Sequence, residues 1–410
     1  MKKKRYVIVG ASARCRGMFL LNFKNKYSDT IEVTGVYDVN RVRSEHFKAI
    51  AGDEMTIYED FDVMLDTEKP DGVLVTTTDK YHHEYIIRAL KKGYNVVSEK
   101  PITQNYENCV AIAKAVKETG HSVATTFNCR FMPIFAKMKE VLLSGKIGNV
   151  LSIDYEYFLN RAHGGDYFKR WHKMMENSGG MLVHKSTHHF DVINWFLEDE
   201  PVKVSALGNR VYYGDISKSF AERCSQCPKG AQCPSYSSQS GTIDKEFYFD
   251  AEHLDGYIRD KCCYLPETDI YDNMSVSVMY SKGTLLTYSL NLFSIRGEGY
   301  KMTITGDKGV LTVENINPED NPTNQHRLDI YTENGVHEIM LFPKGQGGHG
   351  GGDSRLIDKL FGNDKTDDLH QCADYMAGLI SALIGISANE SIATGKTIDI
   401  KERIDYLKNL

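Results

Sequence analysis

The segment 178–191 holds the densest group of side chains that could do acid–base chemistry. Its sequence, SGGMLVHKSTHHFD, contains His184, Lys185, His188, His189 and Asp191. In a helix, His184, His188 and Asp191 fall at i, i+4 and i+7, on one face. The opposite face is apolar and consists of Leu182, Phe190, Ile193 and Leu197. The spacing predicts a helix that buries its apolar face and turns its titratable groups toward a pocket. A metal-binding histidine pair and an exposed polar face are the alternatives.

Lys100 is a second reactive group, placed where a predicted strand ends. It follows the strand 95–98 and precedes a proline, which holds its backbone extended. The strand 72–76 also ends beside polar side chains. The polar residues at these two ends are Thr76, Thr77, His82 and Glu99. Because the carboxyl ends of parallel strands meet in one crevice, we expect these groups to line a ligand site, where a lysine can polarise a hydroxyl oxygen.

Short apolar strands alternate with helices through residues 1–127, and this pattern predicts a parallel, doubly wound α/β sheet of the Rossmann type. The first strand, 6–9, leads into a turn of small residues and then an apolar helix, an arrangement that suits a pyrophosphate. The turn is a degenerate G-x-G-x-x-G fingerprint, because Ser12 and Cys15 stand at its second and third glycine positions. The residues predicted to bind a dinucleotide here are Gly10, Ser12, Ala13 and Arg14.

Asp38 follows the second strand, 31–37, at the distance where an acidic residue meets the adenosine ribose hydroxyls. A carboxylate repels a 2′-phosphate, so the sequence favours NAD over NADP. Arg41 is close enough to keep NADP as an alternative. A helix cap or turn residue is the plainer interpretation of Asp38.

A chain of 410 residues is long enough for two domains, which we place at 1–127 and 128–410. Hydrophobic residues make up 41% and charged residues 25%, as in ordinary globular proteins. The net charge of −6 argues against a nucleic-acid partner. The apolar run after the basic start is too short for a signal sequence, and no run of about 18 apolar residues indicates a membrane span. These features predict a cytoplasmic protein.

Residues 274–341 contain six strand-like runs separated by turns, the signature of a β-meander. A period-two strand, 150–159, comes earlier and is followed by a predicted loop, 160–177, whose aromatic and hydrogen-bonding side chains suit a carbohydrate. An exposed loop held by its own aromatic residues is the alternative. The residues predicted to bind substrate are Tyr157, His163, Tyr167, Trp171, His172 and His189. The glycine-rich segment 345–353 adds His349 and Asp353. A final helix, 370–390, is expected to return to the first domain.

Nine cysteines include a cluster in a predicted insertion near 222–264. The spacing Cys-x2-Cys-x5-Cys with a distal cysteine fits a tetrahedral thiolate site. In a reducing compartment such clusters more often bind a metal than form disulfides. We therefore expect a structural zinc, with free cysteines or an iron–sulfur cluster as alternatives. The predicted ligands are Cys224, Cys227, Cys233 and Cys262, and Cys263 is an alternative to Cys262.

Together these residues resemble the Gfo/Idh/MocA family, which includes glucose-fructose oxidoreductase and inositol dehydrogenase. The resemblance covers nearly the whole chain. It rests on the glycine turn, Asp38, the segment 77–82, Glu99-Lys100-Pro101, the segment 127–133 and the segment 179–191. It implies a nucleotide-binding domain followed by an α+β domain with a large, open, mostly antiparallel sheet that often mediates oligomerisation. A homo-oligomer, either a dimer or a tetramer, is therefore expected.

The resemblance also implies that Lys100 and His188 flank the reacting carbon, and it extends the nucleotide site to Asn128 and Arg130. The family usually carries Asp-x-x-x-His in its second motif, whereas this chain has His184 at the aspartate position and Lys185 next to it. Two imidazoles and an ammonium thus replace a carboxylate and an imidazole, so the roles of these residues and the substrate class are expected to differ.

The preferred hypothesis is hydride transfer between NAD and a carbohydrate or cyclitol. An imidazole with a pKa of about 6.5 suits a base at neutral pH, so His188 is the expected base and Lys100 stabilises charge on oxygen. An NAD-dependent glycosidase is the alternative, because oxidation, elimination, hydration and reduction need extra groups such as His184 and Lys185. A non-catalytic NAD sensor would fit the degenerate glycine turn. A zinc hydrolase with His184 and His188 as metal ligands is a further alternative, but the sequence shows no evident third ligand.

Overall fold

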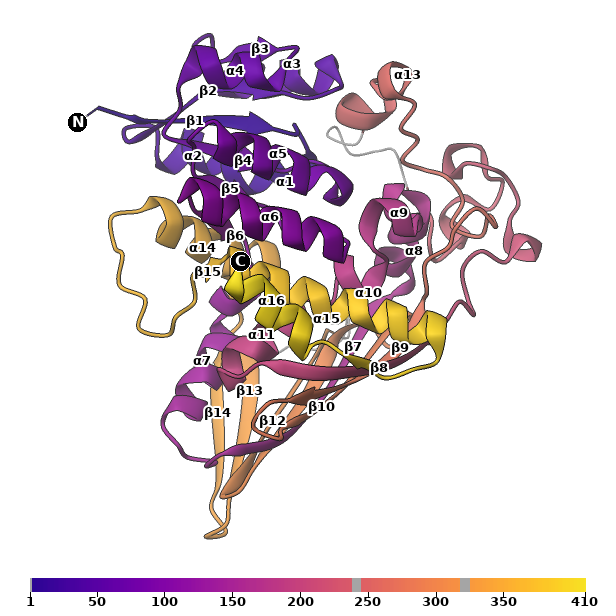
Figure 1. Ribbon diagram of the computed structural model, residues 1–410. Coiled ribbons are helices and arrows are strands. Elements are labelled where there is room, and N and C mark those ends of the chain that lie inside the picture. Colours follow the sequence, from indigo (N-terminus) through magenta and orange to yellow (C-terminus); the bar gives the residue numbers. More distant parts are fainter. Residues whose placement is uncertain (1, 238–244, 318–324) are drawn as a thin grey trace.

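The computed structural model describes residues 2–237, 245–317 and 325–410, which form two β-sheets flanked by helices (Figure 1). The first sheet has the strand order β15-β6-β5-β4-β1-β2-β3. Its parallel strands are β1 (Lys4–Val9), β2 (Ile31–Tyr37), β3 (Thr56–Tyr58), β4 (Gly72–Val75), β5 (Val96–Ser98) and β6 (Val123–Thr125). The doubly wound Rossmann sheet predicted from the sequence is confirmed.

Helices connect these strands. They are α1 (Ala13–Cys15), the π-helical turn Arg16–Leu20, α2 (Leu21–Lys26), α3 (Arg41–Ala51), α4 (Phe61–Glu68), α5 (Asp79–Lys91) and α6 (Tyr106–Thr119). Strand β4 is buried along its whole length, as a parallel strand covered on both faces must be. This layering leaves the carboxyl ends of β1, β2, β4 and β5 as the place where polar loops meet.

The second sheet has nine strands in the order β14-β13-β12-β11-β7-β10-β9-β8-β16. They are β7 (Val150–Asn160), β8 (Pro201–Asn209), β9 (Asn273–Tyr280), β10 (Leu285–Ser294), β11 (Glu298–Gly306), β12 (Gly309–Asn317), β13 (Gln325–Thr332), β14 (His337–Pro343) and β16 (Ile398–Asp399). Only the β7–β10 pair is parallel among neighbours in this sheet. The predicted large, mostly antiparallel sheet is thus confirmed.

One face of this sheet is covered and the other is open. Residues of β9 alternate strictly between exposed and buried, which is the pattern of a strand with one face in the core. Helices α7 (Pro133–Leu143), α11 (Thr187–Leu197) and α15 (Tyr375–Thr394) lie on the covered side (Figure 1). Large apolar side chains on the open face include Leu207, Met279 and Leu285.

The segment 160–177 is helical, so its prediction as a loop was wrong. It forms α8 (Arg161–Lys169), a 3₁₀ turn (Trp171–Lys173) and α9 (Met175–Ser178). The Asn160 side chain caps α8 by accepting a hydrogen bond from the His163 N–H. Gly164, a poor helix former in isolation, is required because a Cβ there would lie 1.8 Å from the Leu292 carbonyl oxygen.

The C-terminal part of the chain touches both sheets. β15 (Ala373–Asp374) pairs antiparallel with β6, and α15 then packs against β8 and α11 before β16 joins the second sheet. Helix α15 is long and apolar enough to cross a membrane by length and composition, and 56% of its apolar window is buried. A buried core helix meets the same criteria of length and apolar composition as a membrane-spanning helix.

Candidate active site

One cavity of about 790 Å³ runs from the carboxyl ends of the parallel strands to the helices of the second domain. Its first part, the nucleotide end, lies against the loops after β1 and β2 and includes Gly10 and Asp38. Its second part, the histidine end, is lined by His163, His172, His184 and His188. The cavity thus joins the two regions that the sequence marked as chemically important.

The turn after β1 lies close to the loop after β4 at the nucleotide end. Gly10 has a φ of 92°, and a Cβ there would lie 2.6 Å from the backbone nitrogen of Thr77, so this position requires glycine. The predicted nucleotide residues that line the cavity are Gly10, Ser12, Ala13, Arg14, Asp38, Thr76, Thr77, His82, Glu99 and Lys100. The small residues of the turn therefore border the open part of the cavity in which a pyrophosphate would bind.

Asp38 lines the cavity and also organises its own turn. Its carboxylate accepts hydrogen bonds from the N–H groups of Ala11 and Asn40, both at 2.7 Å. The Arg43 Nε lies 3.4 Å from the same carboxylate. Both interpretations of Asp38, as a turn residue and as a nucleotide contact, are compatible with this position.

Arg14 ties three distant segments together beside the cavity. Its guanidinium pairs with Glu99 at 3.2 Å and with Asp353 at 2.7 Å. His349, four residues before Asp353, lines the cavity near His188, with ring centroids 5.6 Å apart. The glycine-rich segment therefore does return to this site.

The insertion also reaches the nucleotide end, through α13 (Glu252–Asp255) and the residues before it (Figure 1). Two hydrogen bonds and an ion pair are among the contacts that join the two domains here. They are the hydrogen bonds from Asn40 Nδ2 to the Ala251 carbonyl (2.9 Å) and from the Ala13 N–H to the Tyr248 hydroxyl (3.1 Å), and the ion pair between Arg43 and Asp255. Sequence reasoning missed these residues, because nothing local in the insertion indicates what it covers.

Two of the predicted nucleotide residues do not line the cavity. Arg130 forms a buried ion pair with Asp191, with nitrogen–oxygen distances of 2.7 and 2.8 Å. Asn128 donates a hydrogen bond from its side chain to Asp353 at 2.5 Å. Neither residue is part of the cavity lining, so the structure adds no support to their prediction as cofactor contacts. They tie the segment after β6 to α11 and to the glycine-rich segment.

Lys100 lies where the two ends of the cavity meet. Its Nζ donates a hydrogen bond to the His184 carbonyl at 3.0 Å. Burial lowers the pKa of this ammonium to about 8, although the carboxylates of Asp79 and Glu99 oppose that shift. A lysine whose pKa is near neutrality can hold a proton at pH 7 and lose it under mildly alkaline conditions.

The predicted single helix through 181–191 is wrong, because the chain breaks between α10 (Met181–His184) and α11. The Ser186 hydroxyl, within the break, lies 3.0 Å from the Tyr288 hydroxyl of β10. His184 therefore points in a different direction from His188, although both line the cavity. Its Nδ1 lies 2.5 Å from an Asp79 carboxylate oxygen. Burial, followed by the charge of Lys100, lowers the pKa of His184 well below its ordinary value.

His188 is the side chain best placed to meet a ligand. It is 2% exposed, and neither of its ring nitrogens has a hydrogen-bond partner among the residues that the structure describes. A buried imidazole without partners is costly unless something else supplies them. Burial, followed by the charge of Lys100, holds its pKa well below the ordinary value, so it is neutral at pH 7. A neutral imidazole facing a cavity can accept a proton there.

His189 and Tyr157 lie outside the cavity lining, so the structure adds no support to their prediction as substrate contacts. Successive helical residues point about 100° apart, and His189 therefore faces the sheet, where its Nδ1 lies 2.7 Å from the Tyr288 hydroxyl. The Tyr157 ring packs against it, with ring centroids 4.2 Å apart. Lys185 lines the cavity with its Nζ 5.3 Å from the Tyr157 ring. Burial lowers the pKa of Lys185, but Tyr157 and other neighbours raise it above its ordinary value.

The four other predicted substrate residues do line the cavity: His163, Tyr167, Trp171 and His172. The rings of Trp171 and His172 stack with centroids 3.6 Å apart. His163 lies 2.9 Å from Glu298 and 3.1 Å from the Tyr167 hydroxyl. Aromatic faces beside hydrogen-bonding groups form the kind of wall against which a sugar ring packs.

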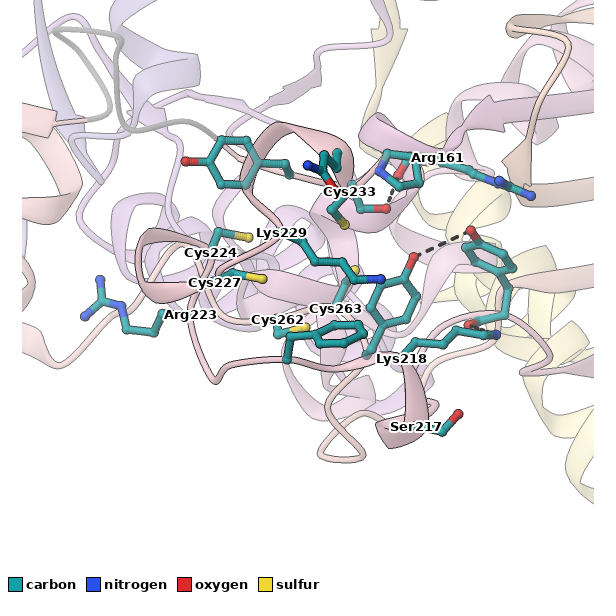
Figure 2. A pocket seen from close by; sticks show the side chains of 17 residues that line it. Arg161, Ser217, Lys218, Arg223, Cys224, Cys227, Lys229, Cys233, Cys262 and Cys263 are labelled. Carbon is teal, nitrogen blue, oxygen red and sulfur yellow. Dashed lines mark hydrogen bonds between the residues drawn. The ribbon is translucent and has the colours of Figure 1, made fainter.

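A second pocket of about 450 Å³ is lined by the clustered cysteines of the insertion (Figure 2). They are Cys224, Cys227, Cys233, Cys262 and Cys263. Hydrogen bonding from Cys263 lowers the pKa of Cys262 to about 6. Within the described residues, however, no three His, Cys, Asp or Glu side chains are grouped so that they could hold a metal ion. The expected zinc site is therefore not supported in the part of the chain that the structure describes, although the spacing did bring the thiols to one pocket.

Residues 4–127 match the NAD-binding Rossmann fold of the Gfo/Idh/MocA oxidoreductase family, and residues 139–400 match the C-terminal alpha/beta domain of the same family. The chain belongs to the Gfo/Idh/MocA family. The first domain is therefore an NAD-binding domain, and the protein is an enzyme of the Gfo/Idh/MocA type.

Relatives within the Gfo/Idh/MocA family agree with this. YteT of Bacillus subtilis (strain 168) is 33% identical over 422 residues, which cover 97% of this chain and 98% of YteT. The 2,7-anhydro-N-acetylneuraminate hydratase of Escherichia coli (strain K12) is 30% identical over 196 residues, covering 48% of this chain and 50% of the hydratase. The fold matches scyllo-inositol dehydrogenase from Lactobacillus casei, solved with NAD(H) and scyllo-inositol, with a TM-score of 0.67 and 19% identity over 97% of this chain and 99% of that one.

A carboxylate lies beside His184, the residue at which this chain departs from the motif that the resemblance implies. Where the family usually carries aspartate, this chain has His184, and the Asp79 carboxylate from the start of α5 pairs with it. Asp79 lies within the segment 77–82 on which the resemblance rested. The sequence could have indicated Asp79 as a site residue, because it lies between two predicted site residues, Thr77 and His82.

Proposed function

We propose that the protein transfers hydride between NAD and a hydroxyl-bearing carbon of a carbohydrate or cyclitol. The observation that carries this proposal is the buried His188 imidazole, which lacks partners among the described residues and shares one cavity with Lys100. The names of relatives that act on a cyclitol and on an anhydro sugar support the substrate class.

The residues at the nucleotide end suit NAD. The glycine turn leaves no room for a Cβ at Gly10, and Asp38 follows β2, where a ribose hydroxyl would be recognised. The residues that would hold the cofactor are the turn 10–14, Asp38, Thr76 and Thr77. Bound NAD supplies the hydride acceptor or donor.

Two side chains would handle the substrate hydroxyl. His188 is neutral at pH 7 and can take the hydroxyl proton on a ring nitrogen. Lys100 stays protonated below about pH 8 and can donate a hydrogen bond to the same oxygen as negative charge develops there. The stacked wall of Trp171 and His172 would orient the ring.

A panel of sugars and cyclitols tests this proposal. Full-length protein is mixed with NAD and each compound, and the absorbance of reduced nicotinamide is followed. Formation of reduced cofactor with at least one compound is expected. If NAD binds but no compound is oxidised, and reduced nicotinamide with the matching ketones is not consumed, the proposal fails and an NAD-binding sensor is favoured.

An NAD-dependent glycosidase is the second candidate, favoured by the number of titratable groups. His172, His184 and Lys185 line the cavity in addition to His188 and Lys100. One base and one lysine suffice for oxidation alone, whereas elimination and hydration require further proton transfers. A glycosidase would release free sugar from a glycoside without accumulating reduced nicotinamide, and chromatography of the products separates the two outcomes.

Replacing Asp79 tests whether its carboxylate raises the pKa of Lys100. Asp79 raises the pKa of Lys100 against the effect of burial. In Asp79→Asn that support is lost, so the pKa of Lys100 falls below about 8 and the alkaline loss of activity moves to lower pH. The pH profile of kcat/KM checks this, with Glu84→Gln at the rim of the same cavity as the control. An alkaline limb at an unchanged pH would contradict this positioning role for Asp79.

We also propose that the protein is a homo-oligomer joined through the open face of the nine-stranded sheet. Leu207 is 77% exposed and Leu285 is 53% exposed on that face. Exposed apolar patches of this kind mark association surfaces. The double variant Leu207→Glu/Leu285→Glu is expected to lower the molar mass in solution, measured by light scattering, without changing the circular dichroism. A wild-type protein that is monomeric at micromolar concentration would overturn this.

A further inference from the structure

Arg43 is a buried arginine at the nucleotide end of the cavity. It lies in the first turn of α3 and lines the cavity together with Asp38. Its Nε lies 3.4 Å from the Asp38 carboxylate but has no hydrogen-bond partner among the described residues. An arginine close to the acidic residue that follows the second strand can accommodate the 2′-phosphate of NADP. Arg43 is therefore placed to oppose Asp38 in the selection of the dinucleotide.

Arg41, the residue that kept NADP as an alternative in the sequence, is held outside the cavity. Its guanidinium pairs with Glu45 at 3.2 Å and with Glu59 at 3.5 Å, and its side chain is 57% exposed. It is not part of the cavity lining. Of the two arginines in the first turn of α3, Arg43 is thus the one that faces the space a dinucleotide would occupy.

Asp255, at the end of α13, pairs with Arg43 from the insertion. Its carboxylate forms an ion pair with the Arg43 guanidinium, and the side chains of Asp255 and Arg43 are 14% and 11% exposed. Asp255 also lines the cavity. The carboxylates of Asp38 and Asp255 share one guanidinium, so two negative charges and one positive charge leave this group with a net charge of −1. Such a group repels a 2′-phosphate but does not repel the uncharged ribose hydroxyls of NAD.

The stretch that carries Asp255 is packed against the first domain. Phe247 is 2% exposed, and its ring centroid lies 5.9 Å from that of Phe47 in α3. The Asp255 carboxylate is fixed at both oxygens, because Oδ1 accepts a hydrogen bond from the Tyr257 N–H at 3.1 Å and Oδ2 pairs with Arg43. A carboxylate fixed in this way keeps the Arg43 guanidinium occupied without a further loss of side-chain entropy.

Arg259 is another guanidinium near this group. The centre of the Tyr248 ring lies 5.8 Å from the Cζ atom of Arg43 and 4.3 Å from that of Arg259. Arg259 also lines the cavity. A phosphate attracted to this region could therefore meet either arginine, and the experiment has to separate their effects.

We propose that Asp255 is a specificity-determining residue, which makes the nucleotide end select NAD over NADP by occupying Arg43. The discriminating residue of a Rossmann domain ordinarily follows its second strand, as Asp38 does here. Asp255 adds to it from a position 212 residues after Arg43. The inference rests on the proposed function only in requiring that a nicotinamide dinucleotide binds at this end, and it is independent of the substrate and of hydride transfer.

The experiment measures the Kd values of NAD and NADP for full-length protein by calorimetry. Wild-type protein is compared with Asp255→Asn, which removes the charge and keeps the shape, and with the double variant Asp255→Asn/Arg43→Gln. Asp250→Asn is the matched control, because Asp250 lies in the same stretch, is 53% exposed and is not part of the cavity lining. Circular dichroism establishes that each variant is folded.

Wild-type protein is expected to bind NAD more tightly than NADP. In Asp255→Asn the preference for NAD should fall about 10- to 100-fold, the range for releasing one hydrogen bond to a charged group, because Arg43 becomes available to a phosphate. The preference is the ratio of two Kd values, so a loosening of the stretch 245–259 that weakens both dinucleotides alike does not change it. The double variant should lose the gained affinity for NADP, and Asp250→Asn should match wild-type protein.

The other outcomes overturn the inference. An unchanged ratio in Asp255→Asn, or a wild-type protein that prefers NADP, shows that Asp255 does not select the dinucleotide and leaves the proposed hydride transfer intact. A gain in NADP affinity that persists in the double variant assigns the phosphate to another cation, such as Arg259, and removes Arg43 from the explanation. A wild-type protein that binds neither dinucleotide overturns this inference and the proposed function together. A shifted ratio in a protein that oxidises no sugar counts against the proposed function alone.

Discussion

In the variant His188→Ala, turnover of an oxidisable sugar is expected to fall by about 10²- to 10⁴-fold, the usual contribution of a positioned base. The Kd for NAD should stay nearly constant, because His188 lies at the histidine end and the glycine turn lies at the other end of the cavity. Stopped-flow or steady-state kinetics measure turnover, and quenching of protein fluorescence measures NAD binding.

The pH dependence gives an independent check on His188. Burial and nearby cations hold the pKa of His188 below its ordinary value of about 6.5. The base is neutral above its pKa and is lost as the pH falls through it, so the acid limb of kcat/KM should lie below the ordinary histidine pKa of about 6.5 in wild-type protein. Equal losses of turnover and NAD affinity in His188→Ala would instead indicate a structural role. His349→Ala, which lines the same cavity, is the matched comparison.

The variant Lys100→Met is expected to lower kcat by about 10²- to 10³-fold, the cost of removing one hydrogen-bond donor from a developing oxyanion. Lys100→Arg keeps the charge, and its pKa lies above about 12. Wild-type activity should therefore decline as the pH rises through about 8, where Lys100 loses its proton, and that alkaline limb should be absent from Lys100→Arg. Full profiles of kcat/KM against pH in both proteins provide the measurement.

The thermal midpoint is the control for Lys100. Removing its ammonium leaves the His184 carbonyl without the donor that it has at 3.0 Å. A moderate loss of stability is compatible with the proposed role, provided that the folded variant still binds NAD. An alkaline limb that persists unchanged in Lys100→Arg would show that a different group titrates near pH 8.

Most of the fold was predictable because its signals are local. The parallel strands show as short apolar runs between helices, and the meander shows as alternation between glycine turns. Local patterns placed Lys100 at a strand end and turned the histidines toward a pocket, and the family resemblance implied that Lys100 and His188 meet. Both residues line one cavity.

The errors came from contacts between distant parts of the chain. The break between α10 and α11 involves Ser186 and Tyr288, which are 102 residues apart. Asp79 and His184, which pair across the site, are 105 residues apart. Arg130 was assigned to the cofactor, yet its buried partner is Asp191, 61 residues away. The periodicity of a sequence indicates which face of a helix is apolar, but it does not indicate which distant residue pairs with the polar side chains of that helix.

The insertion was the least predictable part. Its cysteine spacing indicated that the thiols would gather, and they do, in a pocket separate from the main cavity (Figure 2). The spacing could not indicate that a neighbouring stretch, 245–259, would cross to the first domain. That outcome depends on Asn40 and Arg43, which lie on the far side of the cleft.

Those crossing contacts restrict how the protein can move. A hinge that swung the first domain away from the second would have to break the Asn40–Ala251 hydrogen bond and the Arg43–Asp255 ion pair together. A dinucleotide bound at this end of the cavity would lie beneath the stretch 245–259, and its release would require these two contacts to open first.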